Sequence, residues 1–150
     1  MGKGKIIIIV IVVAFVAIYA WLGFTANSLK IKVLETRLNY AEETIDVEVV
    51  ISNPSSLTVK IAHMRYEMYV DGNKIGSGET YGITVSPGEV KVTLKVKPEK
   101  ETIRATLESL PPEILEKKEI TYKLKGPCKV NVIFDYSVFY ETEGTLSLTT

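Results

Sequence analysis

Hydrophobic positions follow two different patterns along the 150-residue chain, and the first gives way to the second after residue 29. Residues 6–29 contain no charged side chain, and this run exceeds the roughly 20 apolar residues that an α-helix needs to cross a bilayer. It predicts a single transmembrane helix, with Tyr19 and Trp21 at the far membrane interface. Farther along, apolar and polar residues alternate, which is typical of β-strands with one buried face. We therefore divide the chain into an anchor, residues 1–29, and a β domain, residues 30–150.

A cleaved signal peptide is the alternative interpretation of the apolar run. Its hydrophobic region usually spans roughly 7 to 15 residues and ends in a small-x-small cleavage site. The run in this chain is longer, and the candidate residues Ala20 and Ala26 have the large Ile18 and Phe24 two positions before them. We favour an uncleaved anchor.

The orientation of the anchor follows from the positive charges beside it. Lys3 and Lys5 directly precede the apolar run, whereas Lys30, Lys32 and Arg37 lie on its other side, at the start of a long domain. Charges within long domains count little in the positive-inside rule. We expect a single-pass membrane protein with a cytoplasmic N-terminus and an extracytoplasmic domain.

Turn signals divide the β domain into about seven short strands. Pro54 cannot donate a ladder hydrogen bond and restricts Asn53, so a strand must end at Asn53-Pro54. Asp71-Gly72 is the strongest hairpin signal, and Pro87-Gly88 is a further turn. Gly126-Pro127 is expected to end another strand, before a last long strand over residues 130–140. These signals predict an antiparallel β-sandwich.

Two segments depart from the alternation. The apolar phase slips by one residue at Ala62-His63, which predicts a β-bulge. Ile103, Leu107 and Leu110 share one face of a helix, and Pro111-Pro112 is expected to end it. The predicted fold is therefore mainly β, with one short helix added to the sandwich.

The charges exclude one class of partner and suggest a habitat. The formal net charge is zero and the lysines are scattered among glutamates, so we expect no nucleic acid partner. The chain has 15 Lys against 3 Arg, 15 Glu against 3 Asp, and no Gln. Lys and Glu enrichment is common in hyperthermophiles, which makes a thermophilic microbial source a hypothesis.

The residue types that carry chemistry are sparse. His63 is the single histidine and Cys128 the single cysteine, so neither a histidine pair nor a CxxC motif can bind zinc. Serines near Asn53 lack a GxSxG context and fit turn chemistry better. We expect no catalytic residue, cofactor, metal site or small-molecule substrate, and the sequence assigns no role to His63 or Cys128.

The order of motifs in the β domain resembles the late embryogenesis abundant type 2 family, also called the water stress and hypersensitive response domain. The resemblance covers residues 30–150 and rests on four motifs that occur together in order. These are Asn53-Pro54, Val70-Asp71-Gly72, Gly76, and the segment from Tyr122 to Gly126 with the strands between them.

The resemblance implies an immunoglobulin-like or fibronectin-like sandwich without catalytic residues, and an association with stress tolerance. In some membrane-anchored members it also implies lipid or membrane contact. The expected function is a non-enzymatic, membrane-tethered module of archaeal origin that acts in desiccation or stress protection, or in membrane or envelope contact. The alternative is a structural subunit of a membrane complex or archaeal surface filament. In that case the apolar helix would pack against protein partners or other copies of the chain.

Overall fold

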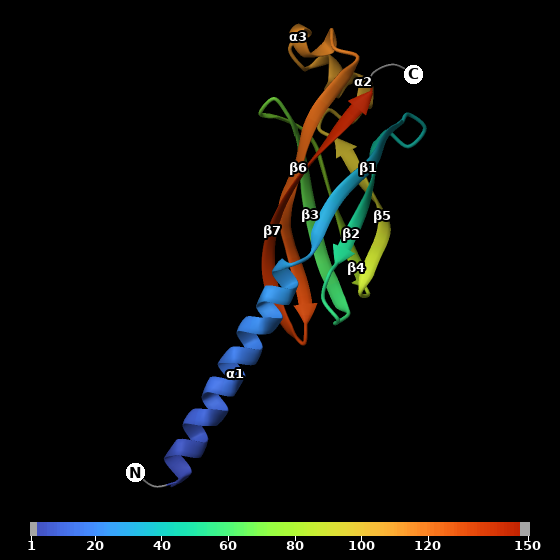
Figure 1. Cartoon of the computed structure of the whole chain (residues 1–150). Coiled ribbons are helices and arrows are strands. Elements are labelled where there is room, and N and C mark those ends of the chain that lie inside the picture. Colours follow the sequence, from blue (N-terminus) through green and yellow to red (C-terminus); the bar gives the residue numbers. More distant parts are fainter. Residues whose placement is uncertain (1–2, 148–150) are drawn as a thin grey trace.

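The computed structural model describes residues 3–147 and shows a long helix that projects from a β domain (Figure 1). Helix α1 spans Lys3–Asn27 and ends two residues before the first strand. Its last turn is closed by side chains, because the Thr25 hydroxyl donates to the Trp21 carbonyl and the Asn27 amide donates to the Gly23 carbonyl.

Seven antiparallel strands form the domain, so the predicted mainly β, antiparallel class is confirmed. They are β1 Lys30–Asn39, β2 Thr44–Asn53, β3 Val59–Val70, β4 Asn73–Val85, β5 Gly88–Pro98, β6 Glu119–Val132 and β7 Phe134–Ser147. Two short helices, α2 Ile103–Glu108 and α3 Pro112–Leu115, lie between β5 and β6. Along the strands, more buried and more exposed residues largely alternate, as in half-buried strands.

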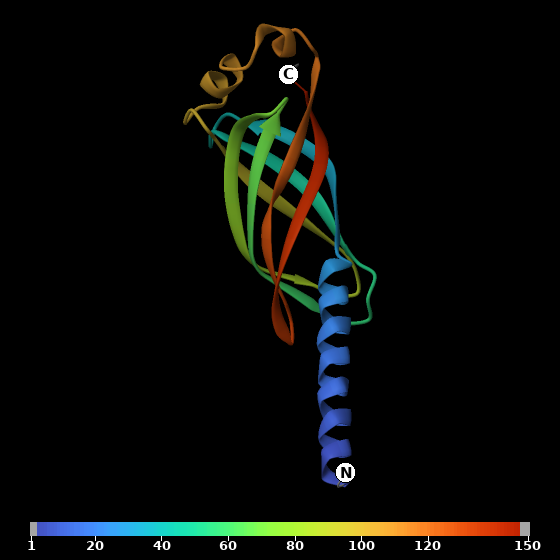
Figure 2. The same ribbon diagram turned by 90° about the vertical axis from the view of Figure 1, so that its left-hand side faces the viewer.

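The strands form one curled sheet in the order β1-β2-β5-β4-β3-β6-β7 (Figure 2). The contact between β4 and β5 is short and joins Gly76 to Pro98 and Ser77 to Lys97. The free edges of β1 and β7 approach each other, and the Thr142 hydroxyl donates to the Ile31 carbonyl. Hydrogen bonds join all seven strands in one sheet. The finer assignment, an immunoglobulin-like or fibronectin-like sandwich, therefore stays a prediction.

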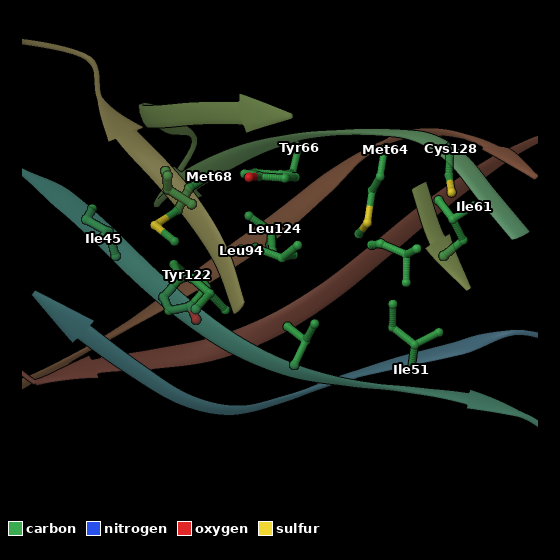
Figure 3. Close-up of a cluster of buried hydrophobic side chains, with 14 of the residues drawn as sticks. Ile45, Ile51, Ile61, Met64, Tyr66, Met68, Leu94, Tyr122, Leu124 and Cys128 are labelled. Atoms are coloured by element: carbon green, nitrogen blue, oxygen red, sulfur yellow. The ribbon is translucent and has the colours of Figure 1, made fainter. Parts of the chain in front are cut away.

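The core lies inside the curl of this sheet. Figure 3 shows aliphatic side chains, two methionines and two tyrosines that meet there from opposite strands. Tyr66 on β3 donates to the Lys95 carbonyl on β5 at 2.9 Å, and the hydroxyls of Tyr122 on β6 and Thr36 on β1 are hydrogen-bonded. Burial raises the pKa of both tyrosines. Each ring adds apolar area to the core while its hydroxyl ties distant strands together.

The predicted phase slip in β3 is a bulge in the structure. The pairing of β3 with β6 shifts between Ile61 and His63, and the buried positions change from Ile61 to Met64 across it. In β4, the other neighbour of β3, Gly82 lies across from the bulge and has a positive φ of 68°. The extra residue lets both halves of β3 bury their apolar side chains.

The prediction of one helix ended by Pro111-Pro112 is wrong. Helix α2 already ends at Glu108, where the Ser109 hydroxyl donates to the Thr106 carbonyl. Pro112 then starts helix α3, because proline at the first helical position loses no hydrogen bond and has the required φ.

The prediction that Gly126-Pro127 ends a strand is also wrong. Strand β6 continues through both residues to Val132, and the reversal falls at Ile133, inside the segment predicted as the last strand. The ladder between β3 and β6 has no pair between Met64–Cys128 and Glu67–Lys125, opposite Pro127. Proline has no N–H to donate to β3 at this point. The Arg65 carbonyl instead accepts a hydrogen bond from the Tyr140 hydroxyl of β7 at 2.7 Å.

Candidate functional site

The end of the domain from which α1 projects is the candidate site. The last turns of the helix enter the domain core, since Leu22, Thr25 and Ala26 are buried. Before these turns, the described side chains from Ile8 to Trp21 are exposed. Helix α1 thus has a core-packed end and an uncovered apolar shaft.

The tip of the β6–β7 hairpin is the second part of the site. It points along α1, toward the helix N-terminus (Figures 1 and 2). The Tyr19 ring lies 5.6 Å from the Phe134 ring and 5.2 Å from the Tyr136 ring, measured between centroids. The Tyr136 hydroxyl donates to the Tyr19 carbonyl at 2.8 Å. These contacts fix the hairpin against the helix.

Close packing of the helix on the hairpin also needs a small residue at position 23. A Cβ atom added to Gly23 would lie 3.0 Å from the Tyr136 ring. The sequence interpretation treated Gly23 only as one residue of an apolar run, so this contact was missed. A glycine within a long helix is its signal in the sequence, but the sequence does not show that the Tyr136 ring packs against it.

Large apolar side chains gather at this end without protein cover. Phe24 and Ile133 are each 75% exposed, Trp21 54%, and Phe134 41%. Trp21 and Phe24 come from the helix, whereas Ile133 and Phe134 come from the hairpin tip. The group, which we call the apolar collar, lies partly on α1 near its core-packed end and partly on the hairpin tip that contacts α1.

Charge divides the domain into two unlike ends. The segments at the helix-proximal end, residues 53–59, 82–88 and 130–134, contain no Lys, Arg, Asp or Glu (Figure 1). By contrast, residues 99–119 at the far end, which include α2 and α3, contain ten charged residues. These three segments can therefore approach an apolar phase without desolvating a charge of their own, and the far end cannot.

Asn53 organises the β2–β3 connection at the uncharged end. Its side chain is 2% exposed, and its amide donates to the carbonyls of Leu57 at 2.7 Å and Val85 at 3.0 Å. Its carbonyl oxygen accepts the Ser55 backbone N–H at 3.1 Å and the Ser55 hydroxyl at 2.6 Å. With Pro54 exposed beside it, the side chain joins this loop to the end of β4, so it shapes the site without facing solvent.

The other motif residues of the sequence interpretation lie elsewhere. Asp71 and Gly72 form the two-residue turn between β3 and β4 at the far end, with φ of 49° and 79°, as a type I′ hairpin requires. Gly76 lies at the junction of β4 and β5, where a Cβ would meet Val96 Cγ1 at 2.6 Å. The motif residues are thus spread over the domain and do not converge on one site.

Tyr122 and Gly126 serve the interior of the sheet. Tyr122 crosses the core to Thr36, as described above. A Cβ on Gly126 would collide with the Arg65 carbonyl, so glycine allows the close approach of β3 and β6. Tyr140, the cross-strand partner of Gly126, reaches the same carbonyl. Burial raises the pKa of Tyr140 well above the ordinary tyrosine value. Sequence reasoning missed this tyrosine, because its partner lies 75 residues away.

His63 and Cys128 have environments that explain them without catalysis. The His63 ring stacks on Tyr81 with 4.4 Å between centroids, and its Nε2 lies 3.0 Å from a Glu79 carboxylate oxygen. This hydrogen bond from His63 is the largest of the effects that lower the pKa of Glu79. Cys128 is buried, and desolvation raises the pKa of its thiol to about 11. A thiol so rarely ionised is a poor nucleophile.

The described part of the chain holds no group of three or more His, Cys, Asp or Glu side chains placed to bind a metal ion. A hollow of about 490 Å³ is lined mainly by polar and charged side chains of β3 and β4, including Arg65, Glu67 and Glu79. The exposed side chains Trp21, Phe24, Ile133 and Phe134 at the helix-proximal end offer apolar contact.

Comparison with known proteins identifies the family. The family profile described as "Late embryogenesis abundant protein" matches residues 48–139. The chain belongs to the late embryogenesis abundant type 2 family. An uncharacterized protein of Methanocaldococcus jannaschii is 36% identical over 61 residues, which cover 40% of this chain and only 15% of that relative.

Solved structures share the fold of this late embryogenesis abundant type 2 chain. A solution structure described as a candidate late embryogenesis abundant protein has a TM-score of 0.57 at 16% identity, covering 92% of this chain and 87% of its own. A protein of Arabidopsis thaliana has a TM-score of 0.57 at 15% identity, with coverage of 79% and 78%. A protein from Archaeoglobus fulgidus has a TM-score of 0.50 at 12% identity, with coverage of 82% and 97%.

Proposed function

We propose that this protein is a non-enzymatic late embryogenesis abundant type 2 module that α1 holds at a membrane. The domain lies on the extracytoplasmic side and acts in stress protection, or in contact with membrane and envelope components, through surface binding. Family membership supports a stress-related module without catalysis.

The two-part character of α1 is the observation that carries the proposal. Residues Ile8–Asn27 form 20 residues of helix, about 30 Å long at 1.5 Å per residue, which matches the hydrocarbon core of a bilayer. A core helix of a soluble protein would be covered along its length, but this shaft is exposed. A signal peptide would be removed, and cleavage after Ala26 would take Leu22 and Ala26 out of the core. An uncleaved anchor fits both ends of the helix.

The test of the anchor uses the full chain expressed in cells. We expect the protein to resist extraction at alkaline pH, to have an intact mass that includes residues 1–29, and to lose its domain to protease added outside the cell. A shortened, soluble protein would show that the apolar run is a signal peptide and would contradict the proposal.

A second experiment separates a tethered module from a filament or complex subunit. A Val12→Cys variant places a thiol on the exposed shaft of α1, whereas the native Cys128 is buried. Oxidation in membranes should leave a tethered module mainly monomeric at low density. A dimer that forms at every density would instead indicate that the helix packs against other copies.

Stress protection is tested on the membrane itself. Vesicles that carry the full chain and an enclosed dye should leak less after drying and rehydration than empty vesicles. Vesicles with a single-pass helix lacking the domain are the control, because they report the effect of the anchor alone. Equal leakage from all three would contradict the protective role.

A further inference from the structure

The apolar collar includes two residues that belong to the β domain and not to the anchor. We propose that the tip of the β6–β7 hairpin, Ile133 and Phe134, inserts into the interfacial layer of the bilayer that α1 crosses. This second contact fixes the tilt and rotation of the domain relative to the membrane. The inference rests on the proposed anchoring by α1 and adds a second membrane contact to it.

The part of α1 that precedes its contact with the hairpin is shorter than the hydrocarbon core of a bilayer. The last charged residue before the apolar run is Lys5, and the hairpin tip contacts α1 at Tyr19. The 14 residues between these positions span about 21 Å of helix, less than the roughly 30 Å of a hydrocarbon core. With Lys5 at one boundary, Tyr19 lies about 9 Å inside the other. The neighbouring Phe134 must then enter the bilayer or thin it.

The second argument is the chemistry of what would enter. Residues 130–134 carry no charge, and the loops beside them, residues 53–59 and 82–88, carry none either. Ile133 is 75% exposed, so its side chain gains little burial from the protein. An exposed isoleucine and phenylalanine at one tip favour an apolar phase, and the neighbouring segments do not oppose it.

The third argument is backbone strain at the tip. Ile133 has a φ of 68°, in the left-handed region that a β-branched residue rarely adopts. Glycine or asparagine would meet the same turn with less strain. A strained and largely exposed isoleucine at the tip of the hairpin indicates a side chain that meets an external partner.

Neighbouring charges limit the depth of insertion. Asp135 follows the tip directly and accepts from the Asn131 amide at 3.0 Å, and its carboxylate lies 3.6 Å from the Lys129 ammonium. The Asn131 hydrogen bond and the Lys129 charge hold the pKa of Asp135 below its usual range, so the carboxylate is ionised at neutral pH. Such a group stays at headgroup level, which confines insertion to Ile133 and Phe134 and requires local thinning of the bilayer to take up the rest of the mismatch.

Fluorescence depth measurement tests the proposal in the full chain reconstituted into phosphatidylcholine vesicles. Ile133→Cys, in a Cys128→Ala background, carries an environment-sensitive label at the tip. Phe139→Cys in the same background is the matched control. Phe139 is 68% exposed and lies five residues, roughly 17 Å, beyond Phe134 along β7. Trp21, the single tryptophan of the chain, reports the anchor itself.

Lipids with a nitroxide high on the acyl chain should quench Trp21 and the label at position 133 strongly, and the label at position 139 at least fivefold less. If Trp21 is quenched but position 133 is not, the hairpin inference is overturned and the anchor stands. If neither is quenched, α1 is not embedded, and both proposals fail. Equal quenching at positions 133 and 139 would overturn the inference too, because the domain would then lie flat on the membrane.

A pair of substitutions gives an independent readout without a label. Phe134→Ser should make the domain reorient more freely, seen as a larger amplitude of nanosecond motion of a spin label on the far hairpin at Asn73→Cys. Phe139→Ser removes the same ring from an exposed site away from the membrane and should leave this motion unchanged. Equal motion in both variants would contradict the proposal, provided that thermal unfolding shows both domains folded.

Discussion

The hydrogen bonds of Asn53 predict that the uncharged end depends on one buried amide. Replacement by leucine keeps the approximate shape of the side chain but removes every polar contact. The Val85 carbonyl and the Ser55 backbone N–H then lose the partners that they have in the structure. The Leu57 carbonyl keeps a contact of 3.2 Å with the Ser55 hydroxyl.

The size of the effect follows from these two orphaned groups. A buried donor or acceptor without a partner costs about 1–3 kcal/mol, so two partly buried groups should cost about 2–4 kcal/mol. For a domain of this size, that loss corresponds to a fall in Tm of about 10 °C. The effect exceeds the ~1 kcal/mol typical of a lost side-chain cap.

Thermal unfolding of the full chain in detergent, followed by near-ultraviolet circular dichroism, measures this loss. Asn73→Leu is the matched control, because Asn73 is exposed and makes one 3.3 Å hydrogen bond to Asp71, so its Tm should change by less than about 2 °C. An Asn53→Leu variant with an unchanged Tm and impaired membrane contact would refute the reasoning. Asn53 would then be a recognition residue and not a structural one.

Four further outcomes follow from the described contacts. Tyr140→Phe should lower the stability by about 1–3 kcal/mol, measured by chemical denaturation, because the Arg65 carbonyl opposite Pro127 loses its donor. Ile133→Gly should leave the Tm unchanged or raise it while it weakens membrane insertion, because glycine relieves the positive φ and little burial is lost. Cys128 should resist alkylation at pH 8 until denaturant is added, given its pKa of about 11. Asn53→Asp should lose stability as the pH rises from about 4 toward 7, because a carboxyl facing two carbonyls has a raised folded-state pKa and is stabilising only while protonated.

Features with a local cause were predictable from the sequence. A two-residue Asp-Gly turn needs two positive φ angles, and the structure has them at Asp71 and Gly72. The bulge at Ala62-His63 follows from a slip in the apolar phase, which is visible within one strand. The family resemblance, which the profile match confirms, was predictable for the same reason, because its motifs are turns and close contacts with a short sequence signature.

Features that depend on distant partners were not predictable in this way. Gly126-Pro127 has every sign of a turn, and β6 passes through it only because Tyr140 supplies the missing donor from another strand. The division of α1 is hidden as well, because Leu22 and Ala26 are no more apolar than the exposed residues before them. Only the curl of the sheet decides which end of a uniform apolar helix is core.

The way α1 joins the domain bears directly on the two candidate roles. A filament subunit needs an apolar shaft that packs on other copies, whereas a tethered module needs a shaft that contacts lipid. Here the Tyr136 hydroxyl bonds the helix backbone, Gly23 admits the Tyr136 ring, and Leu22 is part of the core. Helix and hairpin therefore form one rigid element, with an uncharged end on the side of the anchor. A rigid base of this kind is suited to hold one face of the domain toward lipid, as we propose for the tethered module, and the Val12→Cys experiment decides between this role and the filament subunit.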